Sequence, residues 1–205
     1  MTAFCAWLVA HGSSCLELSA AVFGIAGVYL SIPENIWNWP LGMINVALSC
    51  LLLARQGLFA NAGLQIVYFG LSIYGWYEWL HGGRGRSTLE VSRTAMRTWL
   101  GVTAATLCIW GVLVLVTRRI PGATQGYADA GTTAVSLVAE WMLAKKLLEN
   151  WALWIMIDAV YVGLFVADRL YLLAINYALY LVLAVAGYVA WRRTVQRHET
   201  PAVPA

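Results

Sequence analysis

The sequence predicts an all-α membrane protein with seven transmembrane helices. Three observations carry this prediction: an apolar composition, seven apolar segments of membrane-spanning length, and an internal repeat. Of the 205 residues, 61% are hydrophobic and 11% are charged, and the mean hydropathy is +0.70. Soluble domains carry about 25% charged residues, so lipid must solvate much of this chain. The net charge of +3 is small and predicts no nucleic-acid partner.

A transmembrane helix needs about 20 mostly apolar residues. The segments that fit are 16–32, 37–54, 59–80, 97–117, 128–147, 150–167 and 170–191. Turn-forming residues separate them, as at Pro33 and in "HGGRGRS" at 81–87. The tail "RRTVQRHETPAVPA" (192–205) is polar and is expected to fray. The four cysteines show no CxxC spacing and the three histidines lie near segment ends, so no metal site or cofactor is predicted.

Basic residues predict the orientation, because Lys and Arg gather in cytoplasmic loops. One side of the predicted bundle holds nine of them: Arg84, Arg86, Arg93, Arg97, Lys145, Lys146, Arg192, Arg193 and Arg197. The other side holds four: Arg55, Arg118, Arg119 and Arg169. The N-terminus is therefore predicted outside and the C-terminus in the cytoplasm.

The chain also matches itself at an offset of 112 residues (151 − 39). The matched positions are Trp39 and Trp151, Leu58 and Leu170, Phe59 and Tyr171, Tyr68 and Tyr180, Gly75 and Gly187, and Trp79 and Trp191. Three spans reverse the side of the membrane and a fourth restores it. The two three-helix bundles are therefore predicted to be parallel and joined by a linker helix, a 3+1+3 arrangement. Parallel repeats are a transporter architecture with the substrate near the midplane between the halves.

This repeat divides the chain into five parts. They are an N-terminal segment (1–15), a first bundle (16–80), a linker with the fourth span (81–127), a second bundle (128–193) and a cytoplasmic tail (194–205).

Polar and aromatic side chains recur at helical spacing within the spans. The second span contributes Asn38 and Asn45, the third Gln65 and Tyr68, the fifth Glu140, the sixth Trp151, Trp154, Asp158 and Tyr161, and the seventh Asn176 and Tyr180. Amide side chains in spanning helices can also form hydrogen bonds between helices. So many polar stripes together nevertheless favour a shared cavity over lipid.

Asp158 lies near the centre of "ENWALWIMIDAV" (149–160). An aspartate at mid-helix costs about 2.5–3.5 kcal/mol on insertion, and such residues mostly face a cavity or a partner. No lysine or arginine lies at matching depth to neutralise it. The alternative is a structural aspartate that is protonated or hydrogen-bonded. Trp154 lies one turn away, and aromatic faces attract cations. The site therefore predicts a flat, cationic, partly polar ligand.

At these residues the sequence resembles the PnuC family of vitamin transporters, the bacterial nicotinamide riboside transporters. The resemblance rests on "WNWPLGMINV" (37–46), "YFGLSIYGWYEWL" (68–80), "SLVAEWMLAKKLLENWALWIMIDAVYVGLF" (136–165) and "YLLAINYALYLVLAVAGYVAW" (171–191). It implies a fold similar to the SWEET sugar transporters, in the bacterial cytoplasmic (inner) membrane. It also implies facilitated diffusion, with uptake made unidirectional by a cytoplasmic kinase, and a homotrimer.

The resemblance further implies which residues bind the substrate: Trp37, Asn38, Asn45, Gln65, Trp151 and Trp154. This chain departs from the family at Glu140 and Asp158, where amides are expected in riboside transporters. Relatives of the same superfamily carry thiamine or riboflavin. Nicotinamide riboside and thiamine are both aromatic cations, so the residue chemistry leaves both open, and neutral riboflavin fits less well.

Two other classes of function compete with transport. A membrane enzyme could use Glu140 and Asp158 as general acid and base, but no nucleophile, metal cluster or phosphate loop accompanies them. A non-transporting receptor or a subunit of a larger assembly is the other. Polar residues in both repeats favour transport, because a pathway needs two gates.

Overall fold

The computed structural model describes residues 15–119 and 127–199 of the protein. Its helices are α2 (Cys15–Ser31), α3 (Asn38–Arg55), α4 (Phe59–His81), α5 (Met96–Thr117), α6 (Tyr127–Ala144), α7 (Asn150–Ala167) and α8 (Tyr171–Glu199), with a short 3₁₀ turn η1 (Arg84–Arg86). Across these residues there is no β-sheet, only an isolated bridge between Ser92 and Leu147. The predicted all-helical, seven-helix fold is confirmed. The segments 1–14, 120–126 and 200–205, which include most of the predicted N-terminal segment and part of the tail, lie outside the described residues.

Most helix limits agree with the predicted spans to within one residue, and α7 begins and ends where it was predicted. Two limits differ. The fifth span ends at Ala144, not at 147, because Lys146 takes a left-handed backbone with φ of 49°. The prediction that the tail frays after residue 191 is wrong as far as Glu199, since α8 continues to that residue. Trp191 and Val195 are both buried there, so the last turns of α8 pack against the core.

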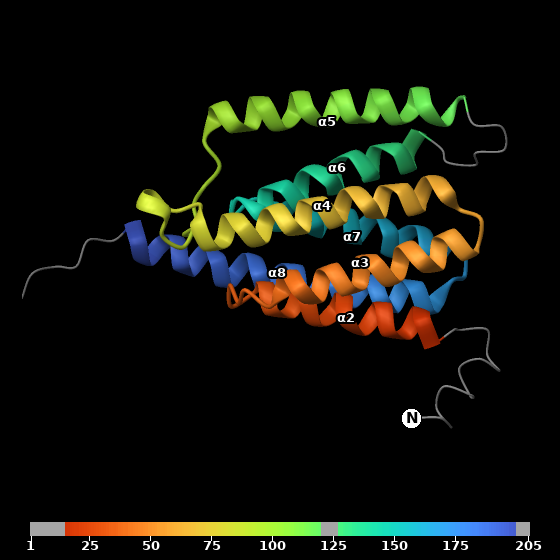
Figure 1. Cartoon of the computed structure of the whole chain (residues 1–205), viewed down its shortest axis with the longest axis horizontal. Helices are drawn as coiled ribbons and strands as arrows, with labels where there is room; N and C mark the ends of the chain where they lie inside the picture. Colours follow the sequence, from red (N-terminus) through yellow and green to blue (C-terminus); the bar gives the residue numbers. More distant parts are fainter. Residues whose placement is uncertain (1–14, 120–126, 200–205) are drawn as a thin grey trace, which may run out of the picture.

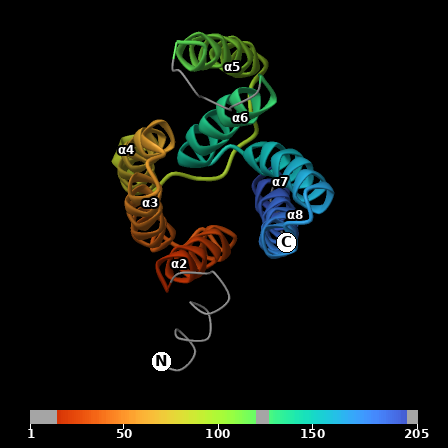
Figure 2. The same ribbon diagram turned by 90° about the vertical axis from the view of Figure 1, so that its right-hand side faces the viewer.

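The helices form two groups around a common centre. Viewed nearly along the helices, α2, α3 and α4 lie on one side and α6, α7 and α8 on the other, with α5 outside α6 (Figure 2). The two groups meet where α4 packs on α6 and where α2 packs on α8. The arrangement is consistent with two three-helix bundles and a peripheral linker helix.

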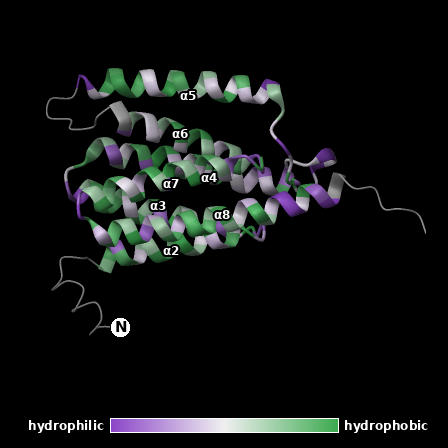
Figure 3. Ribbon diagram, turned by 180° about the vertical axis from the view of Figure 1, so that it is seen from behind, coloured by the Kyte–Doolittle hydropathy of each residue, from purple (hydrophilic) through white to green (hydrophobic). Residues whose placement is uncertain are grey.

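The helices run side by side, with the α2–α3 turn, the α4–α5 segment, the α6–α7 turn and the end of α8 at one end of the molecule (Figure 1). All nine residues that predict the cytoplasmic side belong to that end. Apolar residues recur along every helix (Figure 3). By length and hydropathy alone, three helices of the described part of the chain could cross a membrane: Met96–Thr117, Asn150–Ala167 and Tyr171–Arg197. α2 is apolar but has 17 residues, and the polar side chains of α3, α4 and α6 lower their hydropathy.

Tryptophans at repeat-related positions make the same contacts in both groups. Trp39 meets Trp79 edge-on at 5.4 Å and 86°. Their counterparts Trp151 and Trp191 meet at 5.5 Å and 88°. Each of these contacts requires a glycine, because a Cβ on Gly75 or Gly187 would overlap the ring of Trp39 or Trp151 respectively.

The same positions also join the two groups to each other. Trp79 Nε1 donates a hydrogen bond to the carbonyl oxygen of Leu143 at 3.1 Å. Trp191 Nε1 donates to that of Ser31 at 3.2 Å. Both donors and both acceptors are related by the offset of 112 residues (191 − 79 and 143 − 31). The residues matched by the sequence repeat therefore make reciprocal contacts, as expected of two bundles related by a pseudo-two-fold axis.

Candidate functional site

A cavity of about 660 Å³ lies between the two helix groups. Ten of the twelve residues predicted as substrate-binding line it: Asn38, Asn45, Gln65, Tyr68, Glu140, Trp151, Trp154, Asp158, Asn176 and Tyr180. They come from five helices, α3, α4, α6, α7 and α8. The polar stripes that the sequence placed on separate spans therefore converge on one space.

Two predicted residues, Trp37 and Tyr161, do not line the cavity. Trp37 precedes α3 and is 61% exposed. The Tyr161 hydroxyl lies 3.1 Å from Thr132 Oγ1, and its ring packs against Tyr177 at 4.8 Å. Tyr161 thus lies behind Tyr177, which itself faces the cavity.

The cavity also has lining residues that the predicted site omitted, among them Trp39, Tyr177, Ser31 and Ser72. The repeat could have identified two of them. Trp39 is the counterpart of Trp151, and Tyr177 is the counterpart of Gln65 (177 − 65 = 112).

Four tryptophans close one end of the cavity. Trp39 and Trp151 line it, while Trp79 and Trp191 lie behind them with ring centroids 6.2 Å apart. All four belong to one buried apolar cluster. The cavity extends from this cluster toward Glu17, Leu52 and Leu173, at the opposite ends of their helices.

Buried polar atoms without partners lie at this closed end. Among the described residues they are Asn38 Oδ1, Trp39 Nε1, Asn150 Oδ1 and Trp151 Nε1. They form two repeat-related pairs, since 150 − 38 and 151 − 39 both equal 112. About 90% or more of buried polar groups in proteins are hydrogen-bonded, so these atoms are suited to water or to a bound ligand.

Amide and hydroxyl groups line the walls of the cavity. Asn45 Nδ2 donates to the carbonyl oxygen of Ala20 at 2.7 Å, and this bond leaves the Asn45 carbonyl oxygen available. Asn38 Nδ2 donates to Ser31 Oγ at 3.1 Å. The Tyr68 hydroxyl and Ser136 Oγ, 2.5 Å apart, join α4 to α6. These groups can bind hydroxyls and a carboxamide.

The charged groups on the cavity wall are all acidic. Glu17, Glu140 and Asp158 line the cavity, and no Lys, Arg or His of the described chain does so. Asp158 is 5% exposed. Within residues 15–119 and 127–199, no hydrogen bond or ion pair engages Glu140 or Asp158. An unpaired carboxylate removed from water strongly favours a cationic partner.

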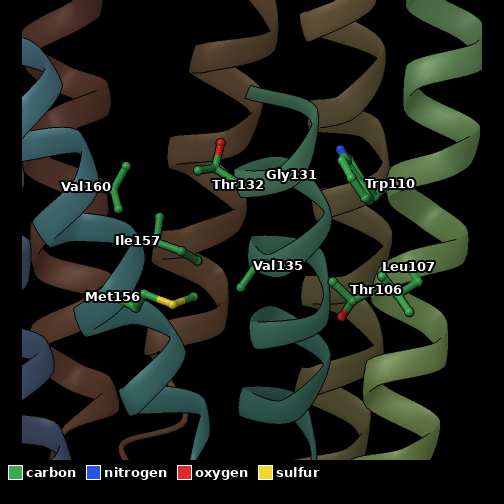
Figure 4. A pocket seen from close by; sticks show the side chains of 9 residues that line it. All are labelled: Thr106, Leu107, Trp110, Gly131, Thr132, Val135, Met156, Ile157 and Val160. Carbon is green, nitrogen blue, oxygen red and sulfur yellow. The ribbon is translucent and has the colours of Figure 1, made fainter. Parts of the chain in front are cut away.

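A second, smaller groove of about 300 Å³ lies between α5, α6 and α7. Its lining is almost entirely apolar, with Leu107 and Trp110 on α5, Val135 on α6, and Met156 and Val160 on α7 (Figure 4). Its polar groups are the hydroxyls of Thr106 and Thr132 and the indole N–H of Trp110. The larger cavity is therefore the candidate substrate site.

Comparison with known proteins agrees with this architecture. A protein-family model described as nicotinamide mononucleotide transporter matches residues 14–193. The chain is 24% identical to the nicotinamide riboside transporter PnuC of Escherichia coli (strain K12), over 87% of this chain and 85% of that protein. It is 29% identical to PnuC of Neisseria mucosa, over 93% and 76%. It is also 26% identical to the riboflavin/roseoflavin transporter RibM of Streptomyces davaonensis, over 90% and 88%.

The fold is similar to the crystal structure of the vitamin B3 transporter PnuC. The TM-score is 0.75 at 26% identity, over 94% of this chain and 87% of that one. These similar proteins are transporters and not enzymes, so the enzyme alternative is set aside. Because the family model covers nearly all of the seven helices, the chain belongs to the nicotinamide mononucleotide transporter family of multi-pass membrane proteins.

Proposed function

We propose that the protein carries nicotinamide riboside across the bacterial cytoplasmic membrane by facilitated diffusion. The observation that carries the proposal is the cavity between the two helix groups, where Asp158 is buried without a partner among aromatic side chains. Nicotinamide riboside is a flat pyridinium cation with ribose hydroxyls and a carboxamide. The names of the PnuC relatives support the same substrate.

The cavity contains a complementary group for each part of this molecule. The pyridinium ring stacks on Trp154 and lies against Asp158, since an aromatic face attracts a desolvated cation by about 2 kcal/mol or more. Asn38, Asn45 and Gln65 bind the carboxamide and the ribose hydroxyls. Trp151 bounds the site at its closed end.

Transport requires the cavity to open alternately to the two sides of the membrane. With the N-terminus outside, the tryptophan end is the cytoplasmic end, and rocking of the two bundles would separate its four rings. No bound coupling ion is required by this scheme. Phosphorylation of the arriving riboside by a cytoplasmic kinase makes uptake unidirectional. The resemblance to the PnuC family implies that the protein assembles as a homotrimer.

Thiamine is the second candidate substrate, because it too is an aromatic cation that an unpaired carboxylate attracts. Riboflavin, which RibM carries by name, is neutral and gains nothing from Asp158. The unpaired carboxylates therefore favour the two cations over the flavin.

Counterflow of labelled vitamin into liposomes that contain only this purified protein tests the proposal. We expect exchange of nicotinamide riboside, loss of that exchange in Asp158→Asn, and no effect of dissipating the proton gradient. Exchange of thiamine alone would keep the transporter and change its substrate. The absence of exchange with all three vitamins would contradict transport of these compounds.

A further inference from the structure

Several positions on the cavity wall have a repeat-related counterpart that also lines the cavity. Two such pairs are Val28 with Glu140 and Val46 with Asp158, each related by the offset of 112 residues (140 − 28 and 158 − 46). All four residues line the cavity. The second repeat thus has carboxyl groups at two positions where the first repeat has valines, so the two repeats differ here in chemistry although their tryptophans match.

The wall of the second repeat holds two carboxyl groups that have no partner in the described residues. Glu140 belongs to α6 and Asp158 to α7, and the part of the chain that the structure describes supplies neither with a hydrogen bond or ion pair. Because a buried carboxylate is costly unless it is paired, this wall is built for a cation from outside the chain.

Aromatic residues of the second repeat line the cavity together with Asp158. Trp154 lies one turn earlier on α7, and Tyr177 and Tyr180 of α8 line the cavity with ring centroids 6.0 Å apart. Rings around a carboxylate form a cage that attracts an aromatic cation through both its charge and its faces.

Apart from Glu17 in the first turn of α2, the cavity wall of the first repeat is neutral. Asn45 and Gln65 line it, and their counterparts in the second repeat are Ile157 and Tyr177. A substrate with a cationic ring at one end and neutral polar groups at the other is therefore held in one orientation.

We infer that Glu140 and Asp158 are specificity-determining residues that select a cationic nucleoside over neutral and anionic forms and direct its charged ring to the wall formed by α6, α7 and α8. This inference rests on the proposed function and deepens it. The two carboxyl groups would disfavour a nucleoside whose ring is uncharged. They would also disfavour a phosphate ester of the nucleoside, because the cavity repels its negative charge.

The test uses three probes that share one skeleton. Nicotinamide riboside carries a pyridinium charge, dihydronicotinamide riboside has the same size without that charge, and nicotinamide mononucleotide adds a phosphate. Counterflow into liposomes gives the ratio of cation to neutral probe for the wild type, Asp158→Asn and Glu140→Gln. Asp168→Asn is the matched control, since it removes an exposed carboxylate at the end of α7 that does not line the cavity.

We expect the wild type to prefer the cation and to exclude the mononucleotide. Asp158→Asn should lower the ratio of cation to neutral probe by about thirtyfold or more, because it removes one partner of a buried charge pair. Glu140→Gln should lower the ratio in the same direction, and Asp168→Asn should leave it unchanged. Counterflow of the neutral probe should change little in every variant, and this separates lost charge selection from lost folding.

Two results would overturn the inference, and they differ in what they say of the proposed function. If the wild type exchanges the riboside and both variants keep its preference over the neutral probe, the inference fails and the proposed function stands. If the wild type exchanges neither nucleoside, the proposed function fails as well. If Asp158→Asn does not fold, the ratio of cation to neutral probe in Glu140→Gln still tests the inference.

Discussion

Lys146 Nζ lies 2.8 Å from Glu34 Oε2, and the two residues occupy the same position in the two repeats, 112 residues apart. Both have left-handed backbones, with φ of 58° at Glu34 and 49° at Lys146. One repeat thus supplies the acid and the other the base of a single ion pair between the bundles. The Lys146 ammonium also lies 4.5 Å from the centroid of Trp79, so the pair sits on the tryptophan cluster at the closed end of the cavity.

Replacing Lys146 with Met should destabilise the protein. The lysine side chain is 7% exposed and that of Glu34 is 25% exposed, so the substitution leaves a largely buried carboxylate without its partner. A loss of about 1–3 kcal/mol is expected, measured as a lower Tm of the purified protein. Arg192→Met is the control, because it removes an exposed basic side chain at the same end of the molecule. A Lys146→Met protein as stable as the control would contradict a role for the ion pair.

The two glycine–tryptophan contacts predict a second pair of effects. Gly75→Ala and Gly187→Ala should each destabilise the fold by about 1–3 kcal/mol, because the added methyl overlaps a buried indole ring. The two losses should be similar, since the pseudo-two-fold axis relates the sites. Gly70→Ala and Gly163→Ala have open space at the new Cβ and should be neutral or stabilising in the same thermal unfolding measurement. Unequal losses at 75 and 187 would argue against equivalent packing in the two repeats.

Much of this architecture could be predicted from the sequence, for reasons that differ between elements. The hydrophobic segments and the polar residues at helical spacing are local signals, so α7 and ten of the residues that line the cavity were predicted. The early end of α6 was missed because it depends on the contact of Lys146 with Glu34, far away in the sequence. The extension of α8 was missed because the polarity of its last turns conceals the packing of Val195.

Trp37 and Trp39 illustrate what local sequence spacing cannot predict, namely which of two nearby indoles is buried. Both lie in "WNWPLG", and spacing alone does not say which indole turns inward. The structure leaves Trp37 61% exposed and Trp39 2% exposed, because Trp39 packs in the space over Gly75. Only the repeat, which pairs Trp39 with Trp151, carried this information in the sequence.

The third prediction concerns substrate binding and compares Trp154, which lines the cavity, with Trp37, which does not. Trp154→Ala should weaken the binding of nicotinamide riboside by roughly thirtyfold, which corresponds to the loss of a desolvated cation–aromatic contact of about 2 kcal/mol. Trp154→Phe should retain part of the affinity. Trp37→Ala removes an indole outside the cavity and should change the dissociation constant little. The dissociation constants can be measured by calorimetry on the purified protein, and a larger effect at 37 than at 154 would move the site.

The closed tryptophan end yields the last prediction, which concerns access from the two sides of the membrane. Leu173 lines the cavity at the end opposite to the tryptophans, whereas Val91 is 6% exposed within the tryptophan cluster. In a variant without native cysteines, a single cysteine at 173 should react with a membrane-impermeant thiol reagent added outside intact cells. Nicotinamide riboside should slow that reaction, and a cysteine at 91 should resist the reagent. Because nine of the thirteen basic residues lie at the tryptophan end, the positive-inside rule predicts that this end faces the cytoplasm. Labelling of position 173 only in inside-out vesicles would show that the predicted orientation is wrong. The cavity would still open away from the tryptophans.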